Sequence, residues 1–535
     1  MLIAGGGPSG LAAAIELGRR GIDCLVVEPR AVLDHLRPRA KTTNVRTMEH
    51  LRRWGLADRL RSVAPLPVGH AQDVVFCTSL LGREIDRFTE AFGLSVGRRE
   101  LFAESGQQVP QPVVEELLRD AAAALPAVML LLGWRVDQLV DGPDGVQAAL
   151  LDPDGARHRV EADYALGCDG GGGVSRAAIG ATYTGSSGSL PNLSVLFRAP
   201  GLDVERLCAV GVHYWVVGGP VAGLMGRLDL DGTWWAIIQG VVPSHETPDV
   251  TMMVQSLIGE DVELDILATD PWSARMLLVN RYRGARTFLV GDAAHLNPPW
   301  GGHGFNTCVG DAVNIGWKLA AVLDGWAGPA LLDSYPQERR PVAQRTIAAA
   351  ADQDAFPASR FAGQDLDSEG QRGDALRAEL ATALQVKEAE FHSLGLVLGY
   401  DYPTSPAVVS DGRPVPRPEL TSYTPSAHAG ARLPHAWLDD GRSIFDLLGP
   451  WFSLLRFDEA IDTEPWTTSA ALNGIPLAIV ELPSHLQERY GAPLLLVRPD
   501  QHVAWRGGPQ HNPAVVLRTV SGLVAPVAPA VVGRP

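Results

Sequence analysis

The chain has 535 residues, 46% hydrophobic and 20% charged, which is enough for two to four domains with large buried cores. Its formal net charge of −16 argues against nucleic-acid binding, and no segment has the length of a transmembrane helix. The five scattered cysteines, Cys24, Cys77, Cys168, Cys208 and Cys308, form no CxxC pair, which argues against disulfide and zinc frameworks. Without a signal peptide, a cytoplasmic location is the default expectation.

The first predicted unit is a strand, a glycine turn, a helix and a second strand. Residues 2–4 end a buried strand, GGGPSG follows, residues 11–20 form a helix, and residues 24–27 form a strand that ends at Glu28. Gly5 permits a tight turn, Gly7 lets the backbone approach a pyrophosphate, and Gly10 allows close helix–strand packing. The helix N-terminus can bind phosphates, and Glu28 can accept hydrogen bonds from a ribose. This unit predicts dinucleotide binding without separating FAD from NAD.

The next predicted acidic motif lies in VEADYALGCDGGGGVSRAAIG, which indicates a strand, a turn at Asp169 and Gly170, and a helix that carries Arg176. Between Tyr183 and Val279 the pattern changes to short alternating stretches such as GVHYWVVGG and TWWAIIQG. These are typical of antiparallel strands. Because Trp234 and Trp235 are adjacent in a strand, at most one of them can face a given pocket.

A third segment favours FAD. A predicted strand at residues 287–290 is followed by GDAAH, a Pro/Gly loop and a long amphipathic helix. Asp292 stands where a carboxylate can bind a ribityl hydroxyl. The glycine loop and the helix N-terminus present N–H groups, and a flavin needs these at N1 and C2=O, where negative charge builds up on reduction.

The remaining residues predict a separate C-terminal unit. Residues 411–418 are rich in proline and indicate a boundary, and a segment from Ala431 onward carries GPWFSLLRF, PLLLVRPDQHVAWRG and a closing helix. Because this unit lacks a CxxC pair, a structural or dimer-contact role is a better hypothesis than a redox role.

At these motifs the chain resembles the para-hydroxybenzoate hydroxylase-type (group A) flavoprotein monooxygenases. The resemblance covers GGGPSG with Glu28, RPRA at residues 37–40, CDG with Arg176, GDAAH through Asn306, DAVNIGWKLAAVL and LLDSYPQERRPVA. The PPWGGHGFNT form and the C-terminal extension are similar to the phenol-hydroxylase and polyketide-tailoring branches.

The resemblance implies an α/β fold of three kinds of domain. These are a Rossmann-like FAD-binding domain of the GR2/PHBH type (residues 1–182, with some substrate-domain insertions, and 281–410, with a helical region), an antiparallel β-sheet substrate domain (183–280) and a thioredoxin-like C-terminal domain (419–535).

It also implies roles for individual residues. The adenosine and pyrophosphate half of FAD would contact Gly5, Gly7, Pro8, Ser9, Gly10, Glu28, Arg37 and Arg39. The ribityl chain would contact Gln111, and Asp169 and Asp292 mark the two acidic motifs. The isoalloxazine would be lined by Pro299, Gly302, Gly304, Phe305 and Asn306. We expect His295 to be structural and leave the role of His303 open. In this family an antiparallel sheet covers the substrate, so the candidate substrate residues are Tyr214, Trp215, Trp235 and Gln239; core positions are the alternative for each.

The implied function is FAD-dependent hydroxylation of an aromatic, phenolic or polycyclic substrate with NAD(P)H and O2, through a C4a-hydroperoxide of the flavin. Lys41 stands where the phenol-hydroxylase branch has an aspartate, so no catalytic residue is assigned. Baeyer–Villiger oxygen insertion and a flavin-binding protein without oxygenase activity remain alternatives. Because no second GxGxxG unit follows Glu28, NAD(P)H must visit the flavin transiently. We expect no metal, and a monomer or homodimer.

Overall fold

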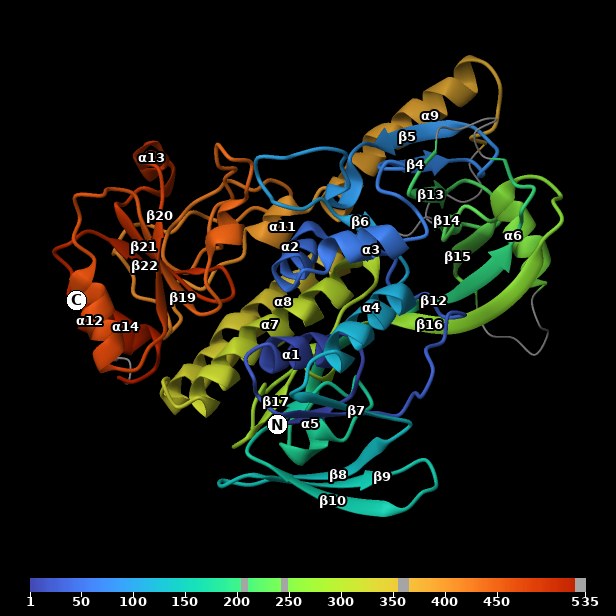
Figure 1. Cartoon of the computed structure of the whole chain (residues 1–535). Helices are drawn as coiled ribbons and strands as arrows, with labels where there is room; N and C mark the ends of the chain where they lie inside the picture. Colours follow the sequence, from blue (N-terminus) through green and yellow to red (C-terminus); the bar gives the residue numbers. More distant parts are fainter. Residues whose placement is uncertain (204–209, 242–248, 355–364, 525–535) are drawn as a thin grey trace, which may run out of the picture.

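The computed structural model describes residues 1–203, 210–241, 249–354 and 365–524 (Figure 1). The N-terminal motif folds into β1 (Leu2–Ala4), α1 (Pro8–Gly18) and β2 (Cys24–Glu28). These strands belong to a five-stranded sheet of order β17-β11-β1-β2-β7, in which every neighbouring pair is parallel. The other three strands are β7 (Val128–Leu132), β11 (Ala165–Gly167) and β17 (Thr287–Leu289). The predicted Rossmann-like fold is therefore confirmed.

Each face of this parallel sheet is covered. On one side α1 packs against α4 (Gln111–Ala123) and α7 (His303–Leu323). The helix α8 (Ser334–Asp354) lies along α7. On the other side lies an antiparallel sheet of β8 (Arg135–Asp141), β9 (Val146–Leu151) and β10 (Arg157–Ala162), which shares a core cluster with Leu2 and Val27. Strands buried on both faces explain the continuous apolar runs in the sequence.

A second, eight-stranded sheet has the order β18-β16-β12-β15-β14-β13-β4-β5. Its strands are β4 (Val74–Cys77), β5 (Glu84–Phe88), β12 (Tyr183–Arg198), β13 (His213–Val216), β14 (Gly223–Arg227), β15 (Thr233–Gln239), β16 (Asp265–Val279) and β18 (His295–Leu296). All neighbouring pairs are antiparallel except β13–β4. The helix α6 (Val250–Ile258) packs its buried Val254 and Leu257 against one face, so the other face is available to the site.

The C-terminal unit is a four-stranded sheet of order β20-β19-β21-β22. Its elements are β19 (Phe452–Arg456), α12 (Glu464–Leu472), β20 (Leu477–Glu481), α13 (Gln487–Tyr490), β21 (Leu494–Val497), β22 (Val503–Gly507) and α14 (Pro513–Val520). Only β19 and β20 pair in parallel. This order and direction of strands is the thioredoxin arrangement that the resemblance implies. The four described cysteines lie outside this unit and are free, and Cys208 falls outside the described residues.

Shorter elements connect these layers. They are β3 (Thr42–Thr43), α2 (Val45–Trp54), α3 (Ala57–Val63), β6 (Gln107–Gln108), α5 (Ser175–Ala178), α9 (Gln371–Leu384), α10 (Glu388–Phe391) and α11 (Leu394–Leu398). Across the described ranges, no helix combines the length and apolar character needed to cross a membrane.

Candidate functional site

One large cavity, of about 980 Å³, is lined both by the N-terminal glycine turn and by the open face of the eight-stranded sheet. Its volume is at the upper end of the range for cofactor and ligand pockets. The lining divides into a polar part, built around Gly5–Ser9 and the loop after β17, and an apolar part under β12, β14, β15 and β16. We refer to these as the glycine part and the sheet part of the cavity.

The glycine turn has the geometry that its sequence predicts. Gly5 has φ +100°, and a Cβ at this position would lie 2.3 Å from the carbonyl oxygen of Cys168. Gly10 does not line the cavity; a Cβ there would lie 1.9 Å from the oxygen of Gly5, so glycine is required for helix–strand packing. At Gly7 a Cβ would meet only the Arg30 guanidinium, at 3.8 Å. The backbone of Gly7 is therefore open to close approach by a ligand, and α1 begins beside it without a side-chain cap.

Glu28 lines the cavity and is already held by the protein. Its Oε2 accepts a hydrogen bond from Gly6 N at 2.8 Å, and its Oε1 accepts from Arg30 Nε at 2.7 Å. Arg30 also reaches Glu115 at 3.1 Å, and Glu115 accepts from Gln111 Nε2 at 2.6 Å. The sequence analysis missed Arg30 and Glu115. A basic residue two positions after the strand-end acid is the signal that could have identified Arg30.

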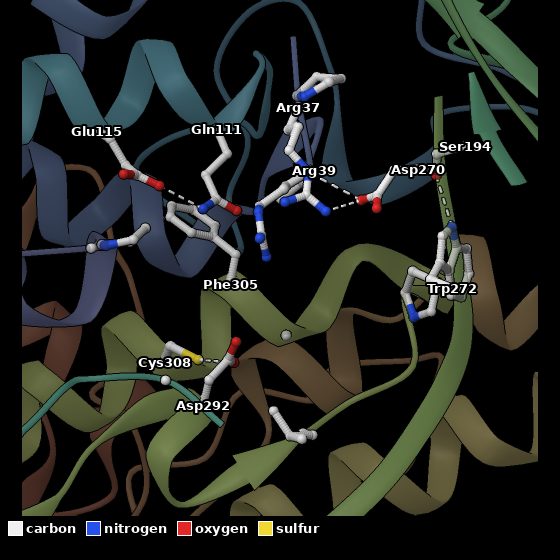
Figure 2. Close-up of a pocket in the computed structure, with 18 of the residues that line it drawn as sticks. Arg37, Arg39, Gln111, Glu115, Ser194, Asp270, Trp272, Asp292, Phe305 and Cys308 are labelled. Carbon is white, nitrogen blue, oxygen red and sulfur yellow. Dashed lines mark hydrogen bonds and ion pairs between the residues drawn. The ribbon is translucent and has the colours of Figure 1, made fainter. Parts of the chain in front are cut away.

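The two arginines of the RPRA motif differ in their partners. Arg37 forms an ion pair with Asp270 of β16, at 2.5 Å. Arg39 lines the cavity, is exposed, has a positive φ of 48°, and has no hydrogen-bond or ion-pair partner within the described part of the chain. Figure 2 shows the Arg37–Asp270 contact and the side chain of Arg39, which has no such contact. Arg39 is therefore available to an anionic ligand.

The two acidic motifs also differ. The Asp169 carboxylate accepts hydrogen bonds from the backbone N–H, at 2.9 Å, and the hydroxyl of Ser175, so it caps the short helix α5. The Asp292 carboxylate is exposed, and the one contact recorded for it among the described residues is the Cys308 thiol, at 3.6 Å (Figure 2). Because a thiol is a weak donor, Asp292 can accept stronger hydrogen bonds from ligand hydroxyls.

The loop between β18 and α7 carries two consecutive glycines with positive φ, Gly301 at 73° and Gly302 at 66°. Pro299, Gly302, Gly304 and Phe305 line the cavity. Asn306 does not line it; it accepts from Asn44 N at 2.9 Å and donates to Gly302 O at 2.8 Å. Asn306 therefore fixes this loop to the segment that follows the RPRA motif.

Neither histidine of this region lines the large cavity. His295 is buried and contacts Asp311 at 2.7 Å; burial disfavours its charged form, but Asp311 raises the pKa of His295 overall. Burial lowers the pKa of His303 to about 4, and this residue lines a separate cavity of about 310 Å³ that Gly301 and Gly302 also line. Both positions agree with structural roles.

In the sheet part, one of the four predicted substrate residues lines the cavity. Trp235 does so, and its neighbour Trp234 lies on the opposite face of β15, as the strand alternation requires. Tyr214 packs on that opposite face under α6, so it is not a wall residue. Trp215 is buried behind the wall against Phe76, at a ring distance of 5.5 Å, and Gln239 does not line the cavity.

Several lining residues of the sheet part were not found from the sequence. The apolar ones include Leu196, Leu224, Ile237, Ala268, Trp272 and Trp300, and the polar ones include Lys41, His213 and Glu390. The Trp272 indole N–H donates to Ser194 Oγ at 2.8 Å, which fixes the ring in the wall (Figure 2). Glu390 comes from α10, far from any recognised motif. The described residues contain no group of histidine, cysteine, aspartate or glutamate side chains that could hold a metal ion.

Comparisons with known proteins give a consistent result. Residues 1–350 match the model of an FAD binding domain, and residues 426–524 match that of the C-terminal domain of aromatic-ring hydroxylases. The chain is 30% identical to FAD-dependent monooxygenase apdD of Emericella nidulans, over 95% of this chain and 87% of that protein. It is 32% identical to tetracenomycin B2 monooxygenase-dioxygenase of Streptomyces olivaceus, over 95% and 94% of the two chains. The solved structure of RebC, soaked with chromopyrrolic acid and with bound 7-carboxy-K252c, matches with a TM-score of 0.88 and 32% identity, covering 98% and 99%.

Proposed function

The chain belongs to the family of FAD-binding aromatic-ring hydroxylases and is an FAD-dependent monooxygenase, and on this premise we propose that it hydroxylates a phenolic ring of a polycyclic natural-product-like substrate. NAD(P)H is the reductant and O2 the oxidant. The observation that supports this proposal is the continuity of the glycine part and the sheet part in one cavity of about 980 Å³. A cofactor and an apolar substrate can meet in such a cavity.

We assign the glycine part to FAD, which supplies electron transfer to O2 and delivery of one oxygen atom to the ring. The N–H groups at the start of α1 and the free guanidinium of Arg39 bind the pyrophosphate. The open backbone at Gly7 fits this assignment, because any larger residue would fill the space that a phosphate needs. Asp292 accepts hydrogen bonds from the ribityl hydroxyls.

The loop of Pro299–Phe305 forms the edge of the cavity at the start of α7. We propose that its N–H groups and the positive end of this helix stabilise the negative charge that gathers at N1 and C2=O of the reduced ring. The role of the protein here is to hold and orient the ring system. Glu28 accepts hydrogen bonds from the ribose with its carboxylate, which Gly6 and Arg30 already hold in place.

We assign the sheet part to the substrate. Trp235, Trp272 and Trp300 contribute aromatic atoms to the wall against which fused rings can pack, and the aliphatic residues between them exclude water. Water exclusion would matter here because it limits side reactions during oxygen transfer. RebC, with its bound 7-carboxy-K252c, supports a substrate of this general size.

The proposal is tested with the FAD-loaded protein and a panel of polycyclic phenols. We expect at least one phenol to stimulate NAD(P)H oxidation and to yield a product that gains one oxygen atom, labelled when the gas phase is 18O2. A product that hydrolyses in base as a lactone or ester would indicate Baeyer–Villiger insertion instead. The proposal would be contradicted if no phenol stimulated NAD(P)H oxidation and no oxygenated product formed.

Reduction by NAD(P)H should depend on substrate. The consecutive left-handed glycines Gly301 and Gly302 suit a loop that must tolerate more than one flavin position. We expect slow anaerobic reduction by NAD(P)H alone and much faster reduction with a true substrate, because substrate binds the reducible arrangement more tightly. Stopped-flow absorbance of the oxidised flavin measures both rates, and equal rates would refute gating without refuting hydroxylation.

A further inference from the structure

The sheet part of the cavity contains a cation without a counterion. Lys41 lines the cavity, and its Nζ lies 4.3 Å from the centroid of the Trp235 ring. No carboxylate of the described residues forms an ion pair with it, and no hydrogen bond from its Nζ is recorded there. The segment that carries it is held by the backbone hydrogen bond from Val109 N to Lys41 O, at 2.8 Å. The backbone at Lys41 is therefore tied to a neighbouring segment.

The charged and titratable groups around Lys41 do not neutralise it. Glu390, which also lines the cavity, is ion-paired with Lys387 at 3.0 Å. Asp270 is paired with Arg37 at 2.5 Å. His213 on β13 is buried with its ring 5.0 Å from that of Trp235, and burial together with the charge of Lys41 lowers the pKa of His213 to about 3. It is therefore neutral at physiological pH and adds no charge of either sign.

A lone ammonium in such a wall is costly unless a ligand pairs with it. Burial lowers the pKa of Lys41 to about 8, with no neighbouring acid to raise it, so the group is still protonated near pH 7. The face of Trp235 gives partial compensation, about 0.5–2 kcal/mol for a typical cation–π contact. The other wall residues are mostly apolar, so an anion that enters would interact with Lys41 in a medium of low dielectric constant.

We propose that Lys41 is a specificity-determining residue that binds an anionic oxygen of the aromatic substrate, a ring carboxylate or a phenolate, over the face of Trp235. This inference rests on the proposed function, because it takes the sheet part as the substrate site. It names the chemical class of substrate: an aromatic compound with an acidic substituent, bound in its ionised form, with any released proton going to solvent. A neutral aromatic compound of the same shape would leave the ammonium unpaired and would bind more weakly.

The experiment measures binding and needs no turnover. The FAD-loaded protein is titrated near pH 7 with 2-naphthoate and its neutral analogue 2-naphthamide, and the flavin absorbance gives each Kd. In parallel, the absorption spectrum of bound 4-nitrocatechol at pH 6 reports whether its phenol group is ionised. A carboxylate site predicts a preference for naphthoate over naphthamide, and a phenolate site predicts the spectrum of ionised nitrocatechol.

The variant K41M should reduce whichever anion preference is found by about tenfold or more, the effect expected for losing a hydrogen bond to a charged group. Naphthamide binding should stay within about twofold, and K41R should retain the preference, because it keeps the charge. The matched control is R98M, which removes a cation 4.0 Å from the Trp437 ring on the exposed surface. R98M should leave both Kd values and the spectrum of bound nitrocatechol unchanged.

The proposal would be overturned if K41M kept both the preference for naphthoate over naphthamide and the ionisation of bound nitrocatechol that the unchanged protein shows. So would the absence of any anion preference in the unchanged protein when naphthamide itself binds. Because the readout is binding, it remains informative if no hydroxylated product is found. A failure of the proposed function is therefore distinguishable from a failure of the Lys41 assignment.

Discussion

Lys318, which is fully buried, and Lys41, which is partly buried in the cavity wall, differ in whether the protein supplies a counterion for their charge. Burial lowers the pKa of Lys318 to about 8, although Glu338 works against that shift, and burial alone lowers the pKa of Lys41 to the same value. Lys318 on α7 donates to Glu338 at 2.6 Å and to Asn314 at 2.8 Å. Lys41 has no such partner among the described residues and faces the cavity.

The surroundings of Lys318 form a network that joins the C-terminal unit to the rest of the molecule. Arg498, which follows β21, donates to both oxygens of Glu338 at 2.6 and 2.8 Å and to Asp500 at 2.6 Å. Nearby, Arg432 is ion-paired with Glu49 of α2. We call these residues the interdomain network.

The comparison teaches that a structural charge has its counterion within the protein, whereas a charge available to a ligand does not. In the interdomain network the protein itself supplies each counterion, so the charges fix how the parts pack. In the cavity Arg39, Asp292 and Lys41 have no strong protein partner within the described residues. The predictions below test this distinction from the largest expected effect to the smallest.

Deletion of the chain after Pro418 should have the largest effect. The truncated protein would keep the residues assigned to FAD but leave Glu49 and Glu338 without Arg432 and Arg498. We expect loss of soluble expression more than a specific defect in flavin chemistry. A soluble truncated protein that holds FAD but cannot be reduced by NAD(P)H would contradict this view.

The substitution E338A should destabilise the full-length protein by about 3–5 kcal/mol, because it leaves two buried cations without their shared acid. Denaturant unfolding of the FAD-loaded protein measures the free energy. The control is E369A, whose exposed pair with Arg83 at 3.1 Å should contribute no more than about 1 kcal/mol. Similar losses in both variants would show that the interdomain network has no special structural role.

The substitution D292A should weaken FAD binding by ~1.5–3 kcal/mol, the cost of losing a hydrogen bond to a charged group. Stability of the FAD-free protein should change little, because Asp292 has only a thiol contact at 3.6 Å to lose. Fluorescence titration of the apoprotein with FAD measures the affinity, and D120A on the exposed face of α4 is the control. Unchanged FAD affinity in D292A would refute the placement of the ribityl chain.

The smallest effect is expected for the stability of K41M. The pKa of Lys41 is about 8 in the folded protein and about 10.5 when unfolded, so between these values the unfolded chain binds more protons and stability rises with pH. The unchanged protein therefore carries the full cost of the buried charge below pH 8. K41M should be at least as stable at pH 7, and its advantage should shrink by pH 9.5.

Thermal unfolding of FAD-loaded K41M and of the unchanged protein, at pH 7 and at pH 9.5, measures this effect. Groups that titrate alike in the two proteins cancel when their stabilities are subtracted. A K41M protein that is clearly less stable at pH 7 would mean that Lys41 supports the fold. The contrast with Lys318 would then be lost.

The sequence alone determined those parts of the molecule whose causes are local. Gly5, Gly7 and Gly10 act within one turn and one helix, so their spacing predicted the geometry that the structure has. Alternation along β15 likewise separated Trp234 from Trp235, because successive side chains of a strand must face opposite sides. The C-terminal unit was indicated by the Pro-rich boundary at residues 411–418, and its thioredoxin-like fold was implied by the resemblance to longer family members.

Only the tertiary structure decided which face of a strand lines the cavity and which charges are paired. Alternation could not say whether Tyr214 or its neighbour faced the cavity, and the sheet packing placed Tyr214 under α6. Glu28 was identified as an acid at a strand end, but its contacts with Arg30 and Gly6 depend on how the turn folds back. Lys41 meets Trp235 and lowers the pKa of His213 only because the fold brings these residues together from strands that are distant from it in the sequence. Charge compensation depends on distances in space, and no local pattern in the sequence encodes them.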